Sequence, residues 1–161
     1  MKQVIAVALA FIVLPTPAHA QTKPDFSGTW TMDASRSASA VQNEPIRSKS
    51  IVIRQTATDL TIERTTDGKT QTIRYKPGAP DSKRSSAATA AESIWYWDAS
   101  RLVTETVGNI SDATVRTKEV LSLDTSGNEL TVETLLVVEH GYTLTGAKNY
   151  SSGKDVYKRV E

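Results

Sequence analysis

Apolar and polar residues alternate with a period of two along most of the chain beyond about residue 25. Short segments rich in Thr, Val, Ile and Tyr recur between turn-forming residues, a pattern typical of strands that bury one face. Beyond the first twenty residues, no apolar stripe at helical spacing extends past two turns. The pattern predicts nine or ten strands, close to residues 26–32, 50–56, 60–65, 71–76, 94–97, 101–107, 114–123, 129–138, 142–150 and 155–160.

The connections between these strands are short. Asp67-Gly68 is the strongest hairpin signal, because both residues readily adopt positive φ. Tight turns are also predicted at 98–101 and at Ser151–Gly153, and a loop at Gly108–Asp112. Residues 33–47 are polar and predict a loop with at most one helical turn. Many short strands joined in this way predict an all-β fold, an antiparallel up-and-down barrel of about 8–10 strands.

The first twenty residues have a different character. Lys2 is followed by the apolar run Val4–Leu14, and Ala18-His19-Ala20 matches a small-residue cleavage site. The run is short for a bilayer span, so residues 1–20 are predicted to be a signal peptide cleaved after Ala20. Residues 21–161 then form the barrel domain. We expect a periplasmic or secreted protein without a membrane anchor in its mature form.

Charge and composition exclude several classes of partner and site. Removing residues 1–20 removes Lys2, one of the 19 Lys and Arg, and none of the 18 Asp and Glu, so the remainder is neutral. A neutral, mixed surface predicts no binding to nucleic acid. There is no cysteine, and His140 is the one histidine beyond residue 20. Common zinc sets and Cys-His nucleophiles are therefore excluded, and no metal, cofactor or catalytic residue is predicted.

Two ends of the chain resemble a known group. The first predicted strand begins with Phe26-Ser27-Gly28-Thr29-Trp30, which is similar to the G-x-W signature of lipocalins and fatty-acid-binding proteins. Tyr157-Lys158-Arg159 lies where those families place an arginine. Trp97-Asp98 before Leu102-Val103, and Glu119–Gly127, extend the resemblance to uncharacterised secreted bacterial lipocalin-like proteins. The resemblance implies a lipocalin-like, calycin-type barrel.

The signature also has a physical interpretation. Gly28 allows the first strand to bend or to approach another backbone closely. Trp30 is expected to close one end of the barrel, with Arg159 across its ring as a cation–π partner. Fatty-acid-binding proteins hold a carboxylate with an Arg-x-Tyr pair on the last strand. Here the order is Tyr157-x-Arg159, so that role does not transfer directly.

An aromatic set suggests where a ligand binds. Trp97 and Leu102 flank the 98–101 turn and are expected to be cross-strand partners, which places Trp95 beside Thr104 on the same face. Since Leu102 is expected to be buried, both tryptophans are predicted to point inward. Rings around a cavity supply apolar surface with polar tips, although the same rings could simply fill the barrel. The candidate ligand-binding residues are Trp95, Trp97, Tyr75, Tyr142, Tyr157 and Arg159.

Three classes of function are compatible with this sequence. The first is binding of a small apolar or amphipathic molecule inside the barrel. The second is a protein–protein module, such as an inhibitor of a secreted hydrolase, with the loops 33–47 and 77–86 as contacts. The third is an enzyme that uses Arg159, Tyr157 or glutamates in the cavity; two titratable groups meeting in a pocket would favour it.

Overall fold

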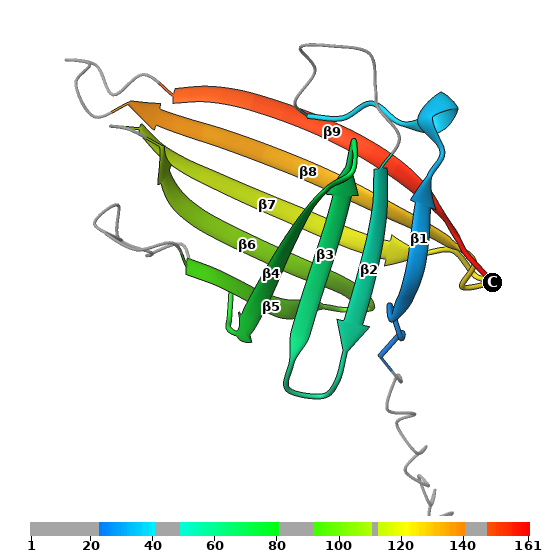
Figure 1. Cartoon of the computed structure of the whole chain (residues 1–161). Coiled ribbons are helices and arrows are strands. Elements are labelled where there is room, and N and C mark those ends of the chain that lie inside the picture. The colour runs from blue at the N-terminus through cyan, green and yellow to red at the C-terminus, as the bar shows by residue number, and fades with distance from the viewer. Residues whose placement is uncertain (1–22, 41–48, 81–91, 111–112, 141–147) are drawn as a thin grey trace, which may run out of the picture.

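The computed structural model describes residues 23–40, 49–80, 92–110, 113–140 and 148–161. In these ranges the strands pair in chain order and β1 closes on β9, which makes a barrel (Figure 1). The shorter strands β1–β4 cross in front of the longer strands β6–β9. The elements are β1 (Gly28–Met32), η1 (Ala34–Arg36), β2 (Lys49–Gln55), β3 (Leu60–Thr66), β4 (Lys69–Pro77), β5 (Glu92–Asp98), β6 (Arg101–Ile110), β7 (Ala113–Leu123), β8 (Glu129–His140) and β9 (Lys148–Arg159).

One pair of neighbouring strands is parallel, where the sequence predicted antiparallel pairing throughout. An odd number of strands cannot close a ring with every neighbour antiparallel, and the described residues form nine. The parallel pair is β4–β5, joined through Lys76↔Ile94 and Pro77↔Trp95. A parallel pair needs a long connection, and residues 78–91 lie between these two strands. The predicted barrel is confirmed, with mixed pairing.

Two predicted tight turns are present. Asp67 and Gly68 both have positive φ, 52° and 74°, as a two-residue hairpin turn requires. Asp98 pairs with Arg101 across a second two-residue turn, in which Ala99 has a φ of 52°, and this brings Trp97 opposite Leu102 as predicted. The register inferred around the aromatic strand is therefore correct.

Two other predicted breaks are wrong. β6 runs through Gly108 and Asn109 to Ile110, where a loop was predicted. Ser151–Gly153 lies inside β9, paired with residues of β8, and is not a turn. The small residues serve a different purpose there, because a Cβ on Gly153 would overlap the backbone of Ala40. The chain after η1 crosses β9 at this point.

The Phe26–Trp30 signature at the first strand closes one end of the barrel. The Trp30 side chain is fully buried, and its indole Nε1 donates to the Phe26 carbonyl at 3.1 Å. The Arg159 guanidinium lies 4.2 Å from the centre of the Trp30 ring, which is the predicted cation–π contact. Gly28 has a φ of 142°, and a Cβ there would meet Arg159 Nη1 at 2.6 Å. The close approach that Gly28 permits is thus to a side chain and not to a backbone.

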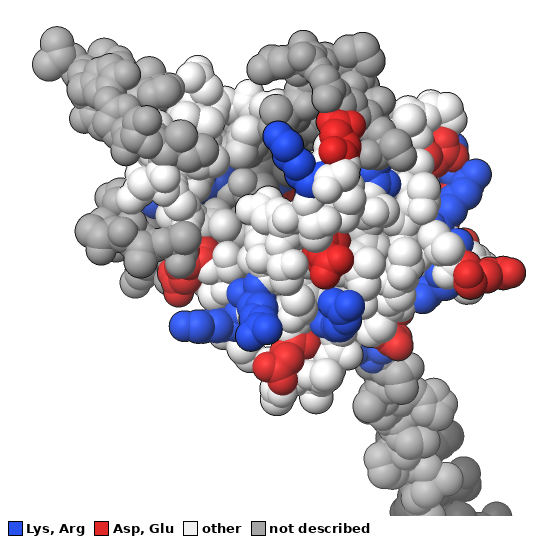
Figure 2. Space-filling model, viewed as in Figure 1, with Lys and Arg blue, Asp and Glu red and all other residues white. Residues whose placement is uncertain are grey.

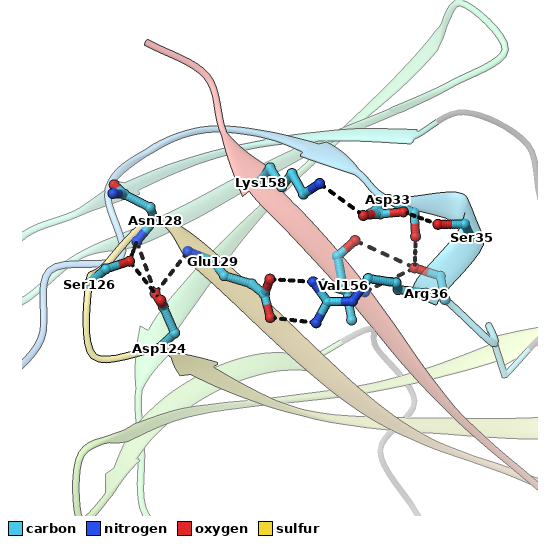
Figure 3. Close-up of polar contacts among 10 residues, drawn as sticks. Asp33, Ser35, Arg36, Asp124, Ser126, Asn128, Glu129, Val156 and Lys158 are labelled. Atoms are coloured by element: carbon cyan, nitrogen blue, oxygen red, sulfur yellow. Dashed lines mark hydrogen bonds and ion pairs between the residues drawn. The ribbon is translucent and has the colours of Figure 1, made fainter.

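A polar cluster on the outside ties this closed end to the β7–β8 hairpin (Figure 3). Arg36 of η1 forms a two-pronged ion pair with Glu129, with distances of 2.5 and 2.9 Å. Lys158 of β9 lies 3.1 Å from Asp33. In the turn itself, Asp124 accepts hydrogen bonds from the Ser126 hydroxyl and from the backbone N–H of Asn128 and Glu129. The cluster joins three elements that are distant in sequence.

Acid should loosen this hairpin through Asp124. The Ser126 hydroxyl, then the backbone N–H groups, lower the pKa of the Asp124 carboxyl to about 2, from an ordinary value of 3.8. A carboxyl whose pKa is lowered by folding contributes stability above its unfolded pKa and loses it as the pH falls. We expect the thermal midpoint of the wild type to fall between about pH 4 and pH 2 more steeply than that of Asp124→Asn.

Ser126→Ala is the second variant in this pH series. It removes the largest cause of the lowered pKa at Asp124, so the loss of stability on acidification should be smaller than in the wild type and should end at a higher pH. Thermal unfolding followed by circular dichroism at half-unit pH steps measures all three proteins. Parallel pH profiles for the wild type and Asp124→Asn would show that this turn does not sense pH.

Candidate functional site

The barrel interior is packed at one end and hollow further along. A cavity of about 230 Å³ lies between β2 and β3 on one side and β7, β8 and β9 on the other. The residues Ser39 and Ala40, which follow η1, also border it. Its other lining residues are the apolar Ile51, Val132 and Leu136, the hydroxyl-bearing Thr66, Thr117, Thr134 and Tyr157, and the charged Lys49, Arg64, Glu119 and Asp155.

Strand alternation explains why charged side chains point into this barrel. Arg64 follows the buried Ile62 by two positions on β3, so both face inward. Glu119 precedes the buried Leu121 by two positions on β7, and the same argument applies. On β3 and β7, the inward-facing positions are therefore apolar at the packed end of the barrel and charged beside the cavity.

Arg64 and Glu119 meet across the interior. Arg64 Nη2 lies 2.5 Å from Glu119 Oε2, and the two side chains are 25% and 15% exposed. The same carboxylate oxygen accepts from the Thr104 hydroxyl at 3.1 Å, and Arg64 Nη1 donates to the Tyr75 hydroxyl at 3.4 Å. Burial alone would lower the pKa of the Arg64 guanidinium, but the Glu119 charge and then Tyr75 outweigh it and raise that pKa. The guanidinium stays charged.

A second polar group also borders the cavity. The Ser39 hydroxyl donates to Asp155 Oδ1 at 2.6 Å and accepts from Lys49 Nζ at 3.2 Å. Ser39 and Asp155 are buried, with 8% and 9% of their surface exposed. The serine thus links an acidic side chain of β9 to a basic one of β2, and it can reach them because Gly153 leaves room for the crossing chain.

Tyr157 contributes a hydroxyl with spare hydrogen-bonding capacity. The side chain lines the cavity and is 3% exposed, and among the described residues no atom hydrogen-bonds to its hydroxyl. Burial, and then the charge of Asp155, raise the pKa of Tyr157. The phenol therefore remains protonated and can donate a hydrogen bond to a molecule in the cavity.

Solved structures with this arrangement of strands were found by comparison of folds. The wild-type fluorescent protein UnaG is similar with a TM-score of 0.52 and 14% identity, over 84% of this chain and 97% of that one. Human cRBP IV is similar with a TM-score of 0.54 and 18% identity, over 85% and 99%. A secretary abundant heat soluble (SAHS) protein from Ramazzottius varieornatus has a TM-score of 0.53 and 12% identity, over 86% and 98%.

The fold is a lipocalin-like, calycin-type barrel. At these identities, the likeness shows the fold alone. No family model matches the sequence, and no curated protein matches it significantly.

The lipocalin-like barrel places the predicted ligand-binding residues in two separate regions. Tyr157 lines the cavity, and Tyr75 touches it indirectly through Arg64. Arg159 lies at the closed end over Trp30 and is not among the cavity-lining residues. Tyr142 lies outside the described residues.

Trp95 and Trp97 point inward as predicted but belong to the packed end. Their ring centres are 6.1 Å apart in an edge-on arrangement, and Phe26 lies 6.1 Å from Trp97. Neither tryptophan is among the residues that line the cavity. Trp95 Nε1 is buried and has no hydrogen-bond partner within the described part of the chain. In this half of the barrel the rings fill the interior, and a role for them in ligand binding stays a prediction.

The charged residues of the cavity were not predicted as a site. From the sequence, glutamates in the cavity were considered only for an enzyme, and no residue numbers were assigned to them. A signal was nevertheless available, because Arg64, Glu119 and Asp155 each stand two positions from a residue expected to be buried on the same strand. Counting from the apolar positions places all three inside.

The outer surface offers no comparable feature on the face that Figure 2 shows. Basic and acidic side chains are interspersed among uncharged ones there. In the described ranges, no group of three or more His, Cys, Asp or Glu is placed to hold a metal ion. Within the same ranges, no helix has the length and apolar character needed to cross a membrane.

Proposed function

We propose that this barrel binds a small amphipathic molecule in its interior cavity. The observation that carries the proposal is a cavity of about 230 Å³ whose lining combines apolar side chains with converging polar groups. Ligand sites in proteins have this composition, in which apolar surface supplies affinity and a few placed polar groups fix orientation. Lipocalin-like barrels of eight to ten strands have interiors of the size to hold one small ligand.

We also propose that the protein works outside the cytoplasm. The support is the predicted signal peptide, residues 1–20, which lies outside the described residues. The resemblance to secreted bacterial lipocalin-like proteins at Phe26–Trp30 and Tyr157–Arg159 supports the same location. A ligand taken up there would come from the cell envelope or the surroundings.

An enzyme is a second candidate, because five titratable side chains border the cavity, four of them charged. Binding is better supported. Glu119 is engaged by Arg64 and Thr104, and Asp155 accepts from Ser39, so neither carboxylate stands ready as a free base. Ser39 is a hydroxyl beside a carboxylate, but its oxygen already accepts from Lys49 Nζ at 3.2 Å and the residue is 8% exposed, so it is not presented to a substrate.

Native mass spectrometry of the protein purified from its own source tests the binding proposal. We expect a fraction of the protein to retain one small molecule. Thr134→Trp fills the cavity from β8 and should abolish retention of the molecule. Glu133→Trp places the same ring at the preceding, exposed position on the outer face of β8, so retention should be unchanged. Two results together would contradict the proposal: the protein is recovered only at its unliganded mass, and no small molecule raises its thermal midpoint.

Trp97→Ala tests, in the same experiment, whether the aromatic end of the barrel contributes to ligand binding. Because Trp97 packs with Phe26 and Trp95 and not against the cavity, we expect lower stability with retention unchanged. Loss of the retained molecule would instead assign the aromatic end to the ligand.

A further inference from the structure

The charges that border the cavity cancel. Two basic side chains, Lys49 and Arg64, face two acidic ones, Glu119 and Asp155. A molecule that brings a net charge into this cavity therefore finds no excess of the opposite charge. Transfer of an unpaired charge from water into a protein interior is costly unless it finds a partner.

The cation best placed to bind an anion is already occupied. Arg64 Nη2 is 2.5 Å from Glu119 Oε2, and its Nη1 donates to the Tyr75 hydroxyl. Glu119 is itself fixed by the Thr104 hydroxyl at 3.1 Å. A carboxylate that entered the cavity would have to displace Glu119 from Arg64, leaving a second carboxylate without its partner.

Ser39 links the other two charges. Its hydroxyl donates to Asp155 and accepts from Lys49, so the acidic and basic groups offset each other through one side chain. Each basic side chain, from β2 or β3, is thus met by an acidic one from β7 or β9.

The unused hydrogen-bonding groups are hydroxyls. Within the described structure, the side-chain hydroxyls of Thr66, Thr117, Thr134 and Tyr157 have no hydrogen-bond partner, and all four residues border the cavity. A hydroxyl can both donate and accept a hydrogen bond. The Tyr157 side chain is the most deeply buried of the four. Such a set recognises groups that are themselves neutral and hydrogen-bonding.

We propose that the ligand is a compact molecule without net charge that carries hydroxyl or amide groups, and that Glu119 excludes carboxylates by occupying Arg64. This inference rests on the proposed small-molecule binding. The size of the cavity limits the ligand further, because 230 Å³ is below the ~300 Å³ at which most ligand pockets begin.

Benzamide and benzoate test the inference, because they have nearly the same shape and differ in charge. Each is titrated to millimolar concentrations into isotope-labelled protein at pH 7, and binding is followed by backbone amide chemical shifts. We expect benzamide to perturb amides near Thr117, Thr134 and Tyr157 and to bind on the order of tenfold more tightly than benzoate.

Glu119→Gln tests the role of the carboxylate directly. The amide keeps a hydrogen-bonding group beside Thr104 but frees the charge of Arg64, so benzoate should bind on the order of tenfold more tightly than to the wild type. Benzamide should change by less than about threefold, within the range of one neutral hydrogen bond. The double variant Arg64→Gln/Glu119→Gln removes both charges and should again prefer benzamide, which keeps the test valid if the single variant does not fold.

The outcomes separate this inference from the proposed function. Benzoate binding to the wild type as tightly as benzamide would overturn the inference, and so would a wild type that binds neither. Recovery of a carboxylic acid in the native mass experiment would overturn the neutral ligand while supporting a binding barrel. An empty cavity in that experiment, with no stabilising small molecule, would overturn the proposed function itself.

Discussion

Replacing Trp30 with alanine is expected to lower the free energy of unfolding by about 3–5 kcal/mol, the usual cost of truncating a buried tryptophan. The ring is fully buried, and its removal leaves a cavity at the closed end. It also takes away the acceptor face for Arg159 and the hydrogen bond from Nε1 to Phe26. For a domain of this length, the thermal midpoint should fall by roughly 10–20 °C.

Tyr150→Ala is the matched control, because this aromatic side chain is 67% exposed. Its loss should change stability by less than about 0.5 kcal/mol, as is usual for surface substitutions. Thermal and urea unfolding followed by far-ultraviolet circular dichroism compare the two variants. If Trp30→Ala and Tyr150→Ala unfolded at the same temperature, Trp30 would not be the residue that closes the barrel.

Replacing Glu119 with leucine is expected to cost about 3 kcal/mol, near the low end for removing one partner of a buried ion pair because the cavity admits water. The substitution leaves the Arg64 guanidinium without its carboxylate in the interior. It also removes the acceptor of the Thr104 hydroxyl. The double variant Arg64→Met/Glu119→Leu should recover most of the loss, because apolar residues of similar volume replace buried pairs at little cost.

An ion pair on the outside of the barrel supplies the control. Arg54 and Glu63 are 3.8 Å apart, with 66% and 32% of their side chains exposed. Glu63→Leu should cost no more than about 1 kcal/mol, as for other surface pairs. Urea unfolding of the four proteins at pH 7 gives the comparison. A single Glu119→Leu variant as stable as the wild type would show that the pair contributes nothing to folding.

The parts of the fold that depend on neighbouring residues were predictable from sequence. Asp67-Gly68 determines its hairpin locally, and the register that places Trp97 opposite Leu102 follows from the turn beside it. The contact between Trp30 and Arg159 was expected because a resemblance placed the two residues on adjoining strands. In each case, either a short segment or a known signature contained the information.

The cavity forms only when the strands close into a barrel, and no local sequence pattern predicts which strands face each other across the interior. Arg64 and Glu119 are 55 positions apart and come together only because β3 and β7 face each other across the interior. Ser151–Gly153 was read as a turn because small residues favour turns. Its place inside β9 is explained by the distant chain at Ala38–Ala40 that crosses it. Both errors come from contacts between segments remote in sequence.

The parallel joint at β4–β5 has a mechanical consequence for the site. This joint pairs only two residues on each strand, fewer than any other neighbouring pair in the ring. Arg64 lies on β3, on one side of the joint, and Glu119 lies on β7, on the other. Their ion pair therefore links the two sides of the barrel across its interior, and a guest that separated these two side chains would pull on the β4–β5 joint.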